Sequence, residues 1–433
     1  MTFDRLSQAL DAPGTRPLPS PVAHVYPNDS RINEKGRLEI GGCDVLELAR
    51  EFGTPSYVFA EKDLWMRAEA VMGAFSVRAD NFEVLYASKA FPCTPSLRIF
   101  ARTGLSCDVA SGGEMRLALA AGFEAERIYM HGNNKTEDEL KFALSEGVGH
   151  IIIDSFDEIN RLARLAQPGQ RVLLRVTPGI QPDTHIKIST GQVDSKFGIP
   201  LAQLPVAVEK CAAAGLDLRG LHGHIGSQVF DLDVYETLAE VLLSAGDFPV
   251  VNMGGGFAAA YTRHQHPPTA AQYADAMLKS LPSNVKVLCE PGRSLVANAG
   301  VTLYTVGTVK DVPLPTGSRK YVAVDGGMAD NIRPMLYDAT YEAEIADRFG
   351  DSTACRVVGM HCESGDILVE NAALEDPRVN DVLVMPATGA YGHAMASNYA
   401  VVRRPPVVFC RDGDARAVVR RETYDDMTVR ELE

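Results

Sequence analysis

The sequence lacks the features that mark secreted, membrane-spanning and zinc-binding proteins. Residues 1–20 contain neither the basic nor the apolar segment of a secretory signal, and no later run approaches the roughly 18 apolar residues of a membrane span. The eight cysteines form no CxxC pair and no cluster with histidine at zinc-ligand spacing. We therefore expect a cytoplasmic protein with free thiols and without a bound metal.

The chain also has fewer positively than negatively charged side chains. The 42 lysines and arginines face 56 aspartates and glutamates, which gives a formal net charge of -14. Charge of this sign repels the phosphate backbone of nucleic acids and the anionic surface of a bilayer. We therefore expect neither nucleic acid nor a membrane as a partner.

The residues that are present indicate an ordinary globular α/β protein of two domains. Apolar residues make up 46% of the chain and charged residues 23%, which is typical of globular proteins. The 433 residues exceed the length of one barrel, about 250 residues, and leave room for a second, smaller domain.

Eight short strand-like runs alternate with helical stretches in the middle of the chain. Three of the helical stretches begin with the S/T-x-x-E capping pattern, at Ser111, Thr136 and Ser155. Strand followed by helix, repeated eight times, is typical of a parallel (β/α)8 barrel of the TIM type. The runs are VLYAS from Val84, LSCDVAS from Leu105, IYMHG from Ile128, HIIID from His150, RVLLRV from Arg171, LRGLHGHIG from Leu218, PVVNMGGG from Pro249 and KVLCEPG from Lys286.

The flanking segments predict the rest of the domain organisation. Residues 1–30 are rich in Pro, Ser and Asp and are expected to be loosely ordered. Residues 60–298 form the predicted barrel. The strand-like segments of residues 299–433 are separated by turn residues and predict an antiparallel β domain, to which strands from residues 31–59 would be added.

Polar residues stand at the ends of the predicted barrel strands, where barrel enzymes carry their active sites. They are Lys89, Asp108, His131, His224, the glycines Gly254, Gly255 and Gly256, and Glu290. Lys89 is either a surface lysine or, beside apolar neighbours at a strand end, a desolvated amine with a lowered pKa. The three glycines form either a tight turn or a cradle of backbone N–H groups for a phosphate.

Two more of these side chains, His224 and Glu290, also have two interpretations each. His224 is either a core histidine or a flat ring for stacking on a cofactor. Glu290 is either an ion-pair partner of Arg293 or the carboxylate that keeps a pyridine nitrogen protonated.

The chain contains an ordered series of motifs over roughly residues 50 to 424. The motifs are YASKAF, SCDVASGGE, HGNNK, DSKFGI, HGHIGSQ, GGGF, EPGR, DGGMADNIRPMLYDA, HCESGD and GAYGHAMASNY. This series resembles the fold type III pyridoxal-phosphate decarboxylases, which have the alanine-racemase fold, and among them the diaminopimelate decarboxylases. The resemblance implies pyridoxal 5'-phosphate as cofactor. It also implies a head-to-tail homodimer in which each active site borrows residues from the partner chain.

The resemblance also implies individual roles. Lys89 would carry the cofactor covalently, His224 would stack on its ring, and Glu290 would bind the ring nitrogen. Cys362 of the partner chain would be the acid that reprotonates the α-carbon, and Lys196 would pair with Asp366 between subunits. The remaining cofactor-binding residues would be Asp108, Ser227, Gly254, Gly255, Gly256, Pro291, Gly292, Arg293 and Tyr391.

The expected substrate is meso-2,6-diaminopimelate, and the products would be L-lysine and CO2, the last step of lysine biosynthesis. Arg333 and Tyr337 are four residues apart, so a helix would place them on one face, where Arg293 could join them in binding the distal carboxylate. Glu363 would bind the distal ammonium, and Tyr391 would also line the substrate site.

Three alternatives remain. A decarboxylase of ornithine, lysine, arginine or a specialised-metabolism amino acid would not need Arg333 and Tyr337. A racemase would not need HCESGD, and a non-catalytic regulatory protein would not need Lys89 and Cys362. The chain also departs from the family pattern at His393, at Ala400, where Asn is usual, and in GGGFAAAY.

Overall fold

The computed structural model describes residues 15–179 and 195–432. The chain divides into two compact units, each with its own core. Unit 1 consists of Met1–Leu64, Ala259–His266 and Val296–Glu433, and unit 2 of Trp65–Ala258 and Pro267–Leu295. None of the described helices is both long enough and apolar enough to cross a membrane.

Unit 2 is the predicted barrel. The strand order β6-β7-β8-β9-β10-β12-β13-β14 closes because β14 pairs with β6 and β10 pairs with β9, and all these pairings are parallel. All eight predicted runs form barrel strands. These are β6 (Phe82–Ala87), β7 (Ser106–Val109), β8 (Ile128–Met130), β9 (His150–Ile153), β10 (Arg171–Thr177), β12 (Asp217–His222), β13 (Val250–Asn252) and β14 (Lys286–Cys289).

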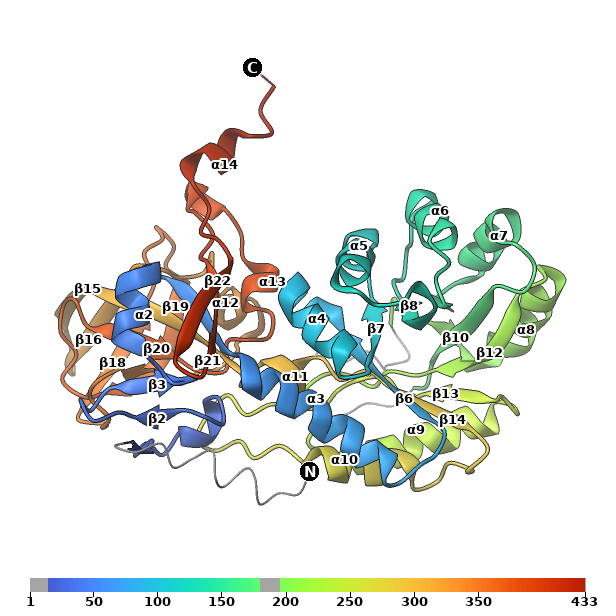
Figure 1. Ribbon diagram of the computed structural model, residues 1–433, viewed down its shortest axis with the longest axis horizontal. Helices are drawn as coiled ribbons and strands as arrows, with labels where there is room; N and C mark the ends of the chain where they lie inside the picture. The colour runs from blue at the N-terminus through green and yellow to red at the C-terminus, as the bar shows by residue number, and fades with distance from the viewer. Residues whose placement is uncertain (1–14, 180–194, 433) are drawn as a thin grey trace. The chain divides into compact units, whose positions relative to one another are not determined.

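Helices surround this ring of strands on its outside (Figure 1). The N-terminal hydroxyls of Ser111, Thr136 and Ser155 each accept the predicted capping hydrogen bond. The helices are α3 (Glu61–Ser76), α4 (Thr94–Arg102), α5 (Gly112–Ala121), α6 (Glu137–Ser145), α7 (Phe156–Leu165), α8 (Leu204–Ala213), α9 (Asp233–Ser244) and α10 (Ala270–Leu278), and a short strand, β11 (Ile199–Pro200), also pairs with β10.

The barrel interior is filled by one layer of large apolar side chains. Six strands each contribute one fully or almost fully buried residue to it, namely Leu85, Tyr129, Ile152, Leu173, Val250 and Leu288. Side chains alternate along each strand, so this layer closes the barrel below the polar strand ends.

A buried ion pair connects the segment that follows β8 with α7, the helix that follows β9. Lys135 Nζ lies 2.6 Å from Glu158 Oε1 and also donates to the carbonyl oxygens of Gly132 and Ile152, at 2.8 and 2.7 Å. Both side chains are only 1% exposed. The other oxygen of Glu158, Oε2, accepts a hydrogen bond from Asp154 N at 3.0 Å, so the carboxylate is bound on both sides and does not complete a capping box with Ser155.

We expect Lys135→Ala to lower the free energy of unfolding by about 3–5 kcal/mol, because the variant leaves the Glu158 carboxylate buried without a counter-charge. Chemical denaturation of the single variant and of Lys135→Met/Glu158→Leu measures this. The double variant should lose clearly less stability than the single one. A loss below about 1 kcal/mol in the single variant would contradict the structural role of the pair.

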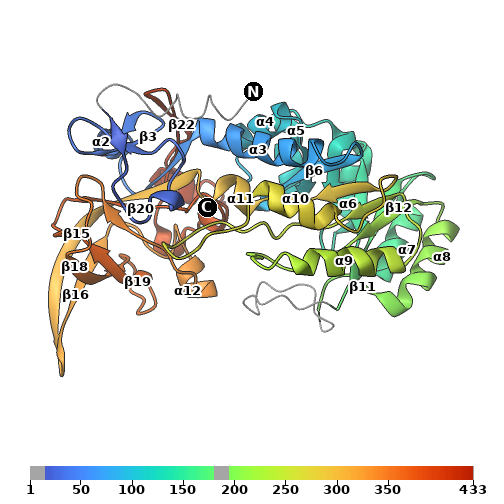
Figure 2. The ribbon, with the colours of Figure 1, turned by 90° about the horizontal axis from the view of Figure 1, so that it is seen from below.

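Unit 1 is built around a nine-stranded sheet with the main order β19-β18-β16-β15-β5-β21-β22. The sheet is mainly antiparallel, as predicted, and contains two parallel pairings, of β16 with β18 and of β5 with β21. Figure 2 shows β15 and β16 as a long ribbon. The strands are β5 (Ser56–Ala60), β15 (Gly300–Leu314), β16 (Gly317–Val324), β17 (Glu344–Ile345), β18 (Thr353–Val358), β19 (Ile367–Leu374), β20 (Val382–Met385), β21 (Val407–Arg411) and β22 (Asp414–Val419).

The prediction of a loosely ordered segment was wrong for residues 15–30. Val22, Val25 and Tyr26 are at most 1% exposed and belong to the core of unit 1. Asn298 Nδ2 donates to the carbonyl oxygen of Val25 at 2.9 Å. The segment leads into a second, antiparallel sheet formed by β1 (Arg16–Pro17), β2 (Arg31–Ile32), β3 (Leu38–Ile40) and β4 (Cys43–Asp44), which precedes α2 (Val45–Phe52).

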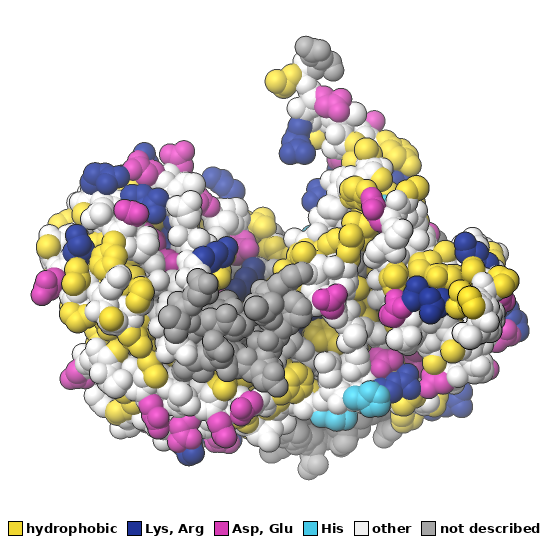
Figure 3. Space-filling view, turned by 180° about the vertical axis from the view of Figure 1, so that it is seen from behind, with side chains coloured by type: hydrophobic (Ala, Val, Ile, Leu, Met, Phe, Trp, Pro, Cys, Tyr) yellow, Lys and Arg dark blue, Asp and Glu magenta, His cyan; other side chains and the backbone are white. Residues whose placement is uncertain are grey.

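Residues 259–266, which lie inside the predicted barrel range, belong to unit 1. Asn298 Nδ2 also donates to the carbonyl oxygen of Ala260, at 2.7 Å, which ties this excursion to unit 1. Acidic and basic side chains are interspersed over the face of the molecule shown in Figure 3.

Candidate active site

The predicted polar residues of the barrel lie at the C-terminal ends of its strands. Lys89 is in a 3-10 helix, η2 (Ser88–Ala90), directly after β6, and Asp108 lies within β7. His131 follows β8 and Glu290 follows β14. A closed parallel barrel brings these strand ends to one mouth.

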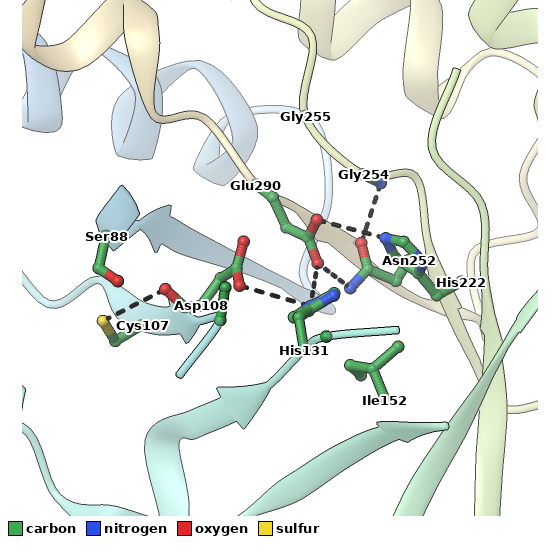
Figure 4. A network of polar contacts seen from close by, with 12 residues as sticks. Ser88, Cys107, Asp108, His131, Ile152, His222, Asn252, Gly254, Gly255 and Glu290 are labelled. Carbon is green, nitrogen blue, oxygen red and sulfur yellow. Dashed lines mark hydrogen bonds and ion pairs between the residues drawn. The ribbon is translucent and has the colours of Figure 1, made fainter. Parts of the chain in front are cut away.

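Glu290 is the centre of a buried polar network (Figure 4). Its Oε1 lies 2.9 Å from His131 Nε2 and accepts a 2.7 Å hydrogen bond from Asn252 Nδ2. Its Oε2 shares a 3.3 Å hydrogen bond with His222 Nε2. The donor atoms of His131, His222 and Glu290 lie within 4.8 Å of one another, and contacts between the side chains already explain that spacing.

The network keeps Glu290 ionised. Burial alone would raise the pKa of the Glu290 carboxyl, but His131 and His222 hold it well below its usual range. The pKa of His222 is lowered to about 4, because burial outweighs the attraction of Glu290. Glu290 can therefore act as a charged hydrogen-bond acceptor in the barrel mouth.

In the glycine turn after β13, fewer backbone N–H groups are available to bind a phosphate than we predicted. Gly254 N donates to Asn252 Oδ1 at 2.9 Å, and Gly255 N donates to His224 Nδ1 at 3.1 Å. Only the N–H of Gly256 has no acceptor among the residues that the structure describes. The predicted phosphate cradle of three successive amides stays a prediction; in this structure the Gly254 and Gly255 amides bind neighbouring side chains, and the Gly256 amide is available.

These glycines are required by close packing. A Cβ on Gly254, where φ is +66°, would lie 2.6 Å from the carbonyl oxygen of Gly223. A Cβ on Gly255 would lie 2.4 Å from the carbonyl oxygen of Glu290. The turn thus binds the ends of β12, β13 and β14 together.

Ser227 and Arg293 meet next to this turn. Arg293 Nη2 donates to Ser227 Oγ at 2.8 Å, and Val229 N donates to the carbonyl oxygen of Gly256 at 2.9 Å. Pro291 and Gly292 are buried between Glu290 and Arg293. A hydroxyl, a guanidinium and one free amide form an anion-binding group of the kind that phosphate requires.

His224 is half-buried and uncharged. Burial, and then the nearby Lys89 ammonium, hold the pKa of His224 well below its usual range, and its Nδ1 accepts from Gly255. Lys89 itself is exposed, so the predicted desolvation of its amine was wrong for this structure. Its charge opposes the rise in the pKa of Asp108 and contributes to the lowered pKa of His224.

Arg333 of unit 1 is buried in an aromatic cage. It begins α12 (Arg333–Tyr337), as the predicted helix requires, and is 6% exposed. Its guanidinium carbon lies 4.8, 5.5 and 5.8 Å from the ring centres of Tyr261, Tyr341 and Tyr391, and its Nη1 donates to the Tyr341 hydroxyl. No carboxylate of the described residues lies within ion-pair distance of this guanidinium.

The other predicted substrate residues of unit 1 are more accessible. Tyr337 and Tyr391 are half-buried, and Cys362 and Glu363 are exposed. The Glu363 carboxylate accepts a hydrogen bond from the Tyr399 hydroxyl.

Asp366, predicted to pair with Lys196 of a partner chain, is already used within its own chain. Its Oδ1 accepts from Met328 N at 2.7 Å and its Oδ2 from His361 N at 2.9 Å. Lys196 is exposed, and its ammonium lies 4.9 Å from the ring centre of Phe197.

Two of the departures from the family pattern, Ala400 and His393, can be described in the structure. Ala400 has φ +53°, a left-handed conformation that Asn adopts more readily than Ala. His393 packs edge-on against Tyr57 with ring centres 5.8 Å apart, and burial lowers its pKa to about 4.

Sequence reasoning missed four residues that complete these groups. His222 and Asn252 support Glu290, and Tyr261 and Tyr341 enclose Arg333. His222 could have been found, because it lies two residues before His224 and strand alternation points both rings to the same side. Nothing in the local pattern around the two tyrosines signals the cage.

The donor set of unit 2 fits pyridoxal phosphate. Ser227, Arg293 and the Gly256 amide would hold its phosphate, and the flat, neutral ring of His224 suits stacking. Ionised Glu290 suits a protonated ring nitrogen, and Lys89 supplies the amine.

Comparison with known proteins gives the same result. Residues 64–297 match the family model described as "Pyridoxal-dependent decarboxylase, pyridoxal binding domain". Diaminopimelate decarboxylase of Bacillus subtilis is 44% identical over 93% of this chain and 97% of its own, and that of Actinosynnema pretiosum is 43% identical over 99% and 100%.

Among solved structures, the chain is similar to the diaminopimelate decarboxylase of M. jannaschii in complex with L-lysine. The TM-score is 0.84 with 30% identity, and the match covers 93% of this chain and 98% of the other. The barrel is closed, the motifs are present, and the identities exceed 40% over nearly the whole chain. The protein therefore belongs to the diaminopimelate decarboxylase family of pyridoxal-dependent decarboxylases.

Proposed function

We propose that the protein removes CO2 from meso-2,6-diaminopimelate and releases L-lysine, the final step of lysine biosynthesis. The observation that carries this choice of substrate is Arg333, a buried guanidinium without a carboxylate partner among the described residues. A buried charge is costly unless it is paired. The tyrosine cage stabilises the cation but supplies no negative charge.

The substrate's distal carboxylate would supply the missing charge. Diaminopimelate carries a carboxylate and an ammonium at the end away from the reacting carbon, whereas ornithine and lysine carry only an ammonium. Arg333 is suited to the carboxylate because a guanidinium binds it through two parallel hydrogen bonds. Glu363 is the matching acceptor for the ammonium, and Tyr399 orients its carboxylate.

The chain's own residues divide the chemistry among them. When bound, the cofactor supplies an electron sink for the carbon that loses CO2. Lys89 would hold the cofactor covalently, and Ser227 and Arg293 would bind its phosphate. His224 would stack on its ring, and the ionised Glu290 carboxylate would accept a hydrogen bond from the protonated ring nitrogen.

Cys362 is the proposed proton donor to the α-carbon after CO2 leaves. We expect Cys362→Ala to slow turnover by about 10²–10⁴-fold, because a positioned acid contributes that much to a proton transfer. Its cofactor content, measured by absorbance, should equal that of the unchanged protein. Turnover at the original rate would remove Cys362 from this role.

The family resemblance supports a homodimer in which Cys362 and Glu363 serve the active site of the partner chain, and it supports a cytoplasmic location. The described cysteines are all free thiols, as a reducing compartment maintains them. We retain the pairing of Lys196 with Asp366 of the partner as part of the proposal, although Asp366 also has intrachain hydrogen bonds.

The choice of substrate is tested by measuring CO2 release from meso-diaminopimelate, ornithine, lysine and arginine with one enzyme preparation. We expect release from diaminopimelate only. Release from ornithine with none from diaminopimelate would overturn the proposal and assign Arg333 a structural role.

A further inference from the structure

His131 lies between two carboxylates that come from other strands. Its Nε2 is 2.9 Å from Glu290 Oε1 and 3.7 Å from Asp108 Oδ1, and the residue is 7% exposed (Figure 4). The ring also meets His222 edge-on, with centres 4.9 Å apart. One imidazole nitrogen therefore faces both acidic groups of the site.

Two other buried cations near the barrel mouth have carboxylate partners. Lys135 is paired with Glu158 at 2.6 Å, and Arg175 with Asp154 at 3.7 Å. The pairs leave Asp108 and Glu290 as two carboxylates facing one imidazole.

The charges at His131 follow from these neighbours. Burial would lower its pKa, but Asp108 and Glu290 outweigh burial and Arg175, so the pKa of His131 is raised. Burial raises the pKa of Asp108 to about 6, a rise that His131 and Lys89 oppose and Glu290 and Glu114 favour. His222 stays neutral at neutral pH.

We propose that His131 is a positioning residue that acts as a buried cation shared by Asp108 and Glu290, and so keeps Glu290 ionised for the cofactor's ring nitrogen. The proposal rests on the cofactor site described above. Two carboxylates and one imidazolium leave one negative charge, which matches the single positive charge of a protonated pyridine ring. Without the imidazolium, two neighbouring carboxylates would retain a proton between them as the pH rises.

The variant His131→Gln separates charge from packing, because glutamine keeps a hydrogen-bond donor and loses only the charge. The matched control is His150→Gln. His150 is also buried, stacks on Tyr129 at the start of β9, and has its pKa lowered to about 4, so it is neutral. The same substitution there removes an imidazole but no charge.

The dissociation constant of pyridoxal phosphate is measured by absorbance titration of the cofactor-free full chain between about pH 6.5 and pH 8. We expect His131→Gln to bind on the order of ten- to a hundredfold more weakly at the lower pH, the size typical of the loss of a group that supports a ligand-binding side chain. The loss should shrink as the pH rises, because the carboxylate pair then releases the proton that it retains in the variant and Glu290 becomes ionised without His131. His150→Gln should follow the unchanged protein.

A loss in His131→Gln that is the same at every pH would show a packing role and overturn the proposal, as would affinity equal to the unchanged protein. The result does not depend on the substrate. If the unchanged protein binds the cofactor but releases no CO2 from diaminopimelate, the proposed function fails while this pH profile still decides the role of His131.

Discussion

Replacing Lys89 with alanine is expected to abolish covalent attachment of the cofactor and to lower turnover by at least about a thousandfold, as loss of a covalent catalytic group does. Lys89 directly follows the first strand of the barrel, and its charge acts on Asp108 and His224. The amine is therefore electrostatically coupled both to the carboxylate network and to the ring that would stack on the cofactor.

The measurement for this variant combines two readouts. Borohydride reduction followed by peptide mass spectrometry locates the attached cofactor in the unchanged protein, and steady-state CO2 release gives the rate. Lys279→Ala is the matched control, since Lys279 is a surface lysine of the same unit paired with Glu236 at 2.6 Å. Attachment at another lysine would contradict the role of Lys89.

The second large effect is expected from Arg333→Leu, which should lower kcat/KM for diaminopimelate by about 10²–10³-fold. Two charge-assisted hydrogen bonds to a carboxylate, at about 1.5–3 kcal/mol each, support a loss of this size. Because Arg333 is proposed to bind the end of the substrate that does not react, KM should carry much of the loss. Cofactor absorbance should not change.

Arg403→Leu is the control for the loss of an arginine stacked on tyrosine. Arg403 lies 4.8 Å from the ring centre of Tyr424 and is exposed. The control should leave kcat/KM unchanged. If Arg333→Leu turns over diaminopimelate normally, the buried guanidinium has only a structural role and the substrate assignment loses its support.

The barrel was predictable because its strands and helices have strong local signals. The β-branched runs and the capping residues Ser111, Thr136 and Ser155 define them along the chain. Strand ends in a parallel barrel must converge, so the meeting of Asp108 with Glu290 followed from topology alone.

What could not be predicted depends on contacts between distant segments. The burial of Tyr26 and the excursion of residues 259–266 are set by tertiary packing, to which Asn298 contributes. The parallel pairing of β5 with β21 joins segments some 350 residues apart, beyond any local pattern. The engagement of the Gly254 and Gly255 amides likewise depends on Asn252 and His224, whose rotamers the sequence does not specify.

The most direct test of the proposed activity is the mass balance of the reaction with purified protein and added cofactor. Meso-diaminopimelate is supplied, and CO2, L-lysine and remaining diaminopimelate are measured together over time. We expect CO2 and L-lysine to form in equal amounts and to match the diaminopimelate consumed. A change in the stereochemistry of diaminopimelate without CO2 would instead show a racemase, and absence of any reaction with bound cofactor would contradict the proposed activity.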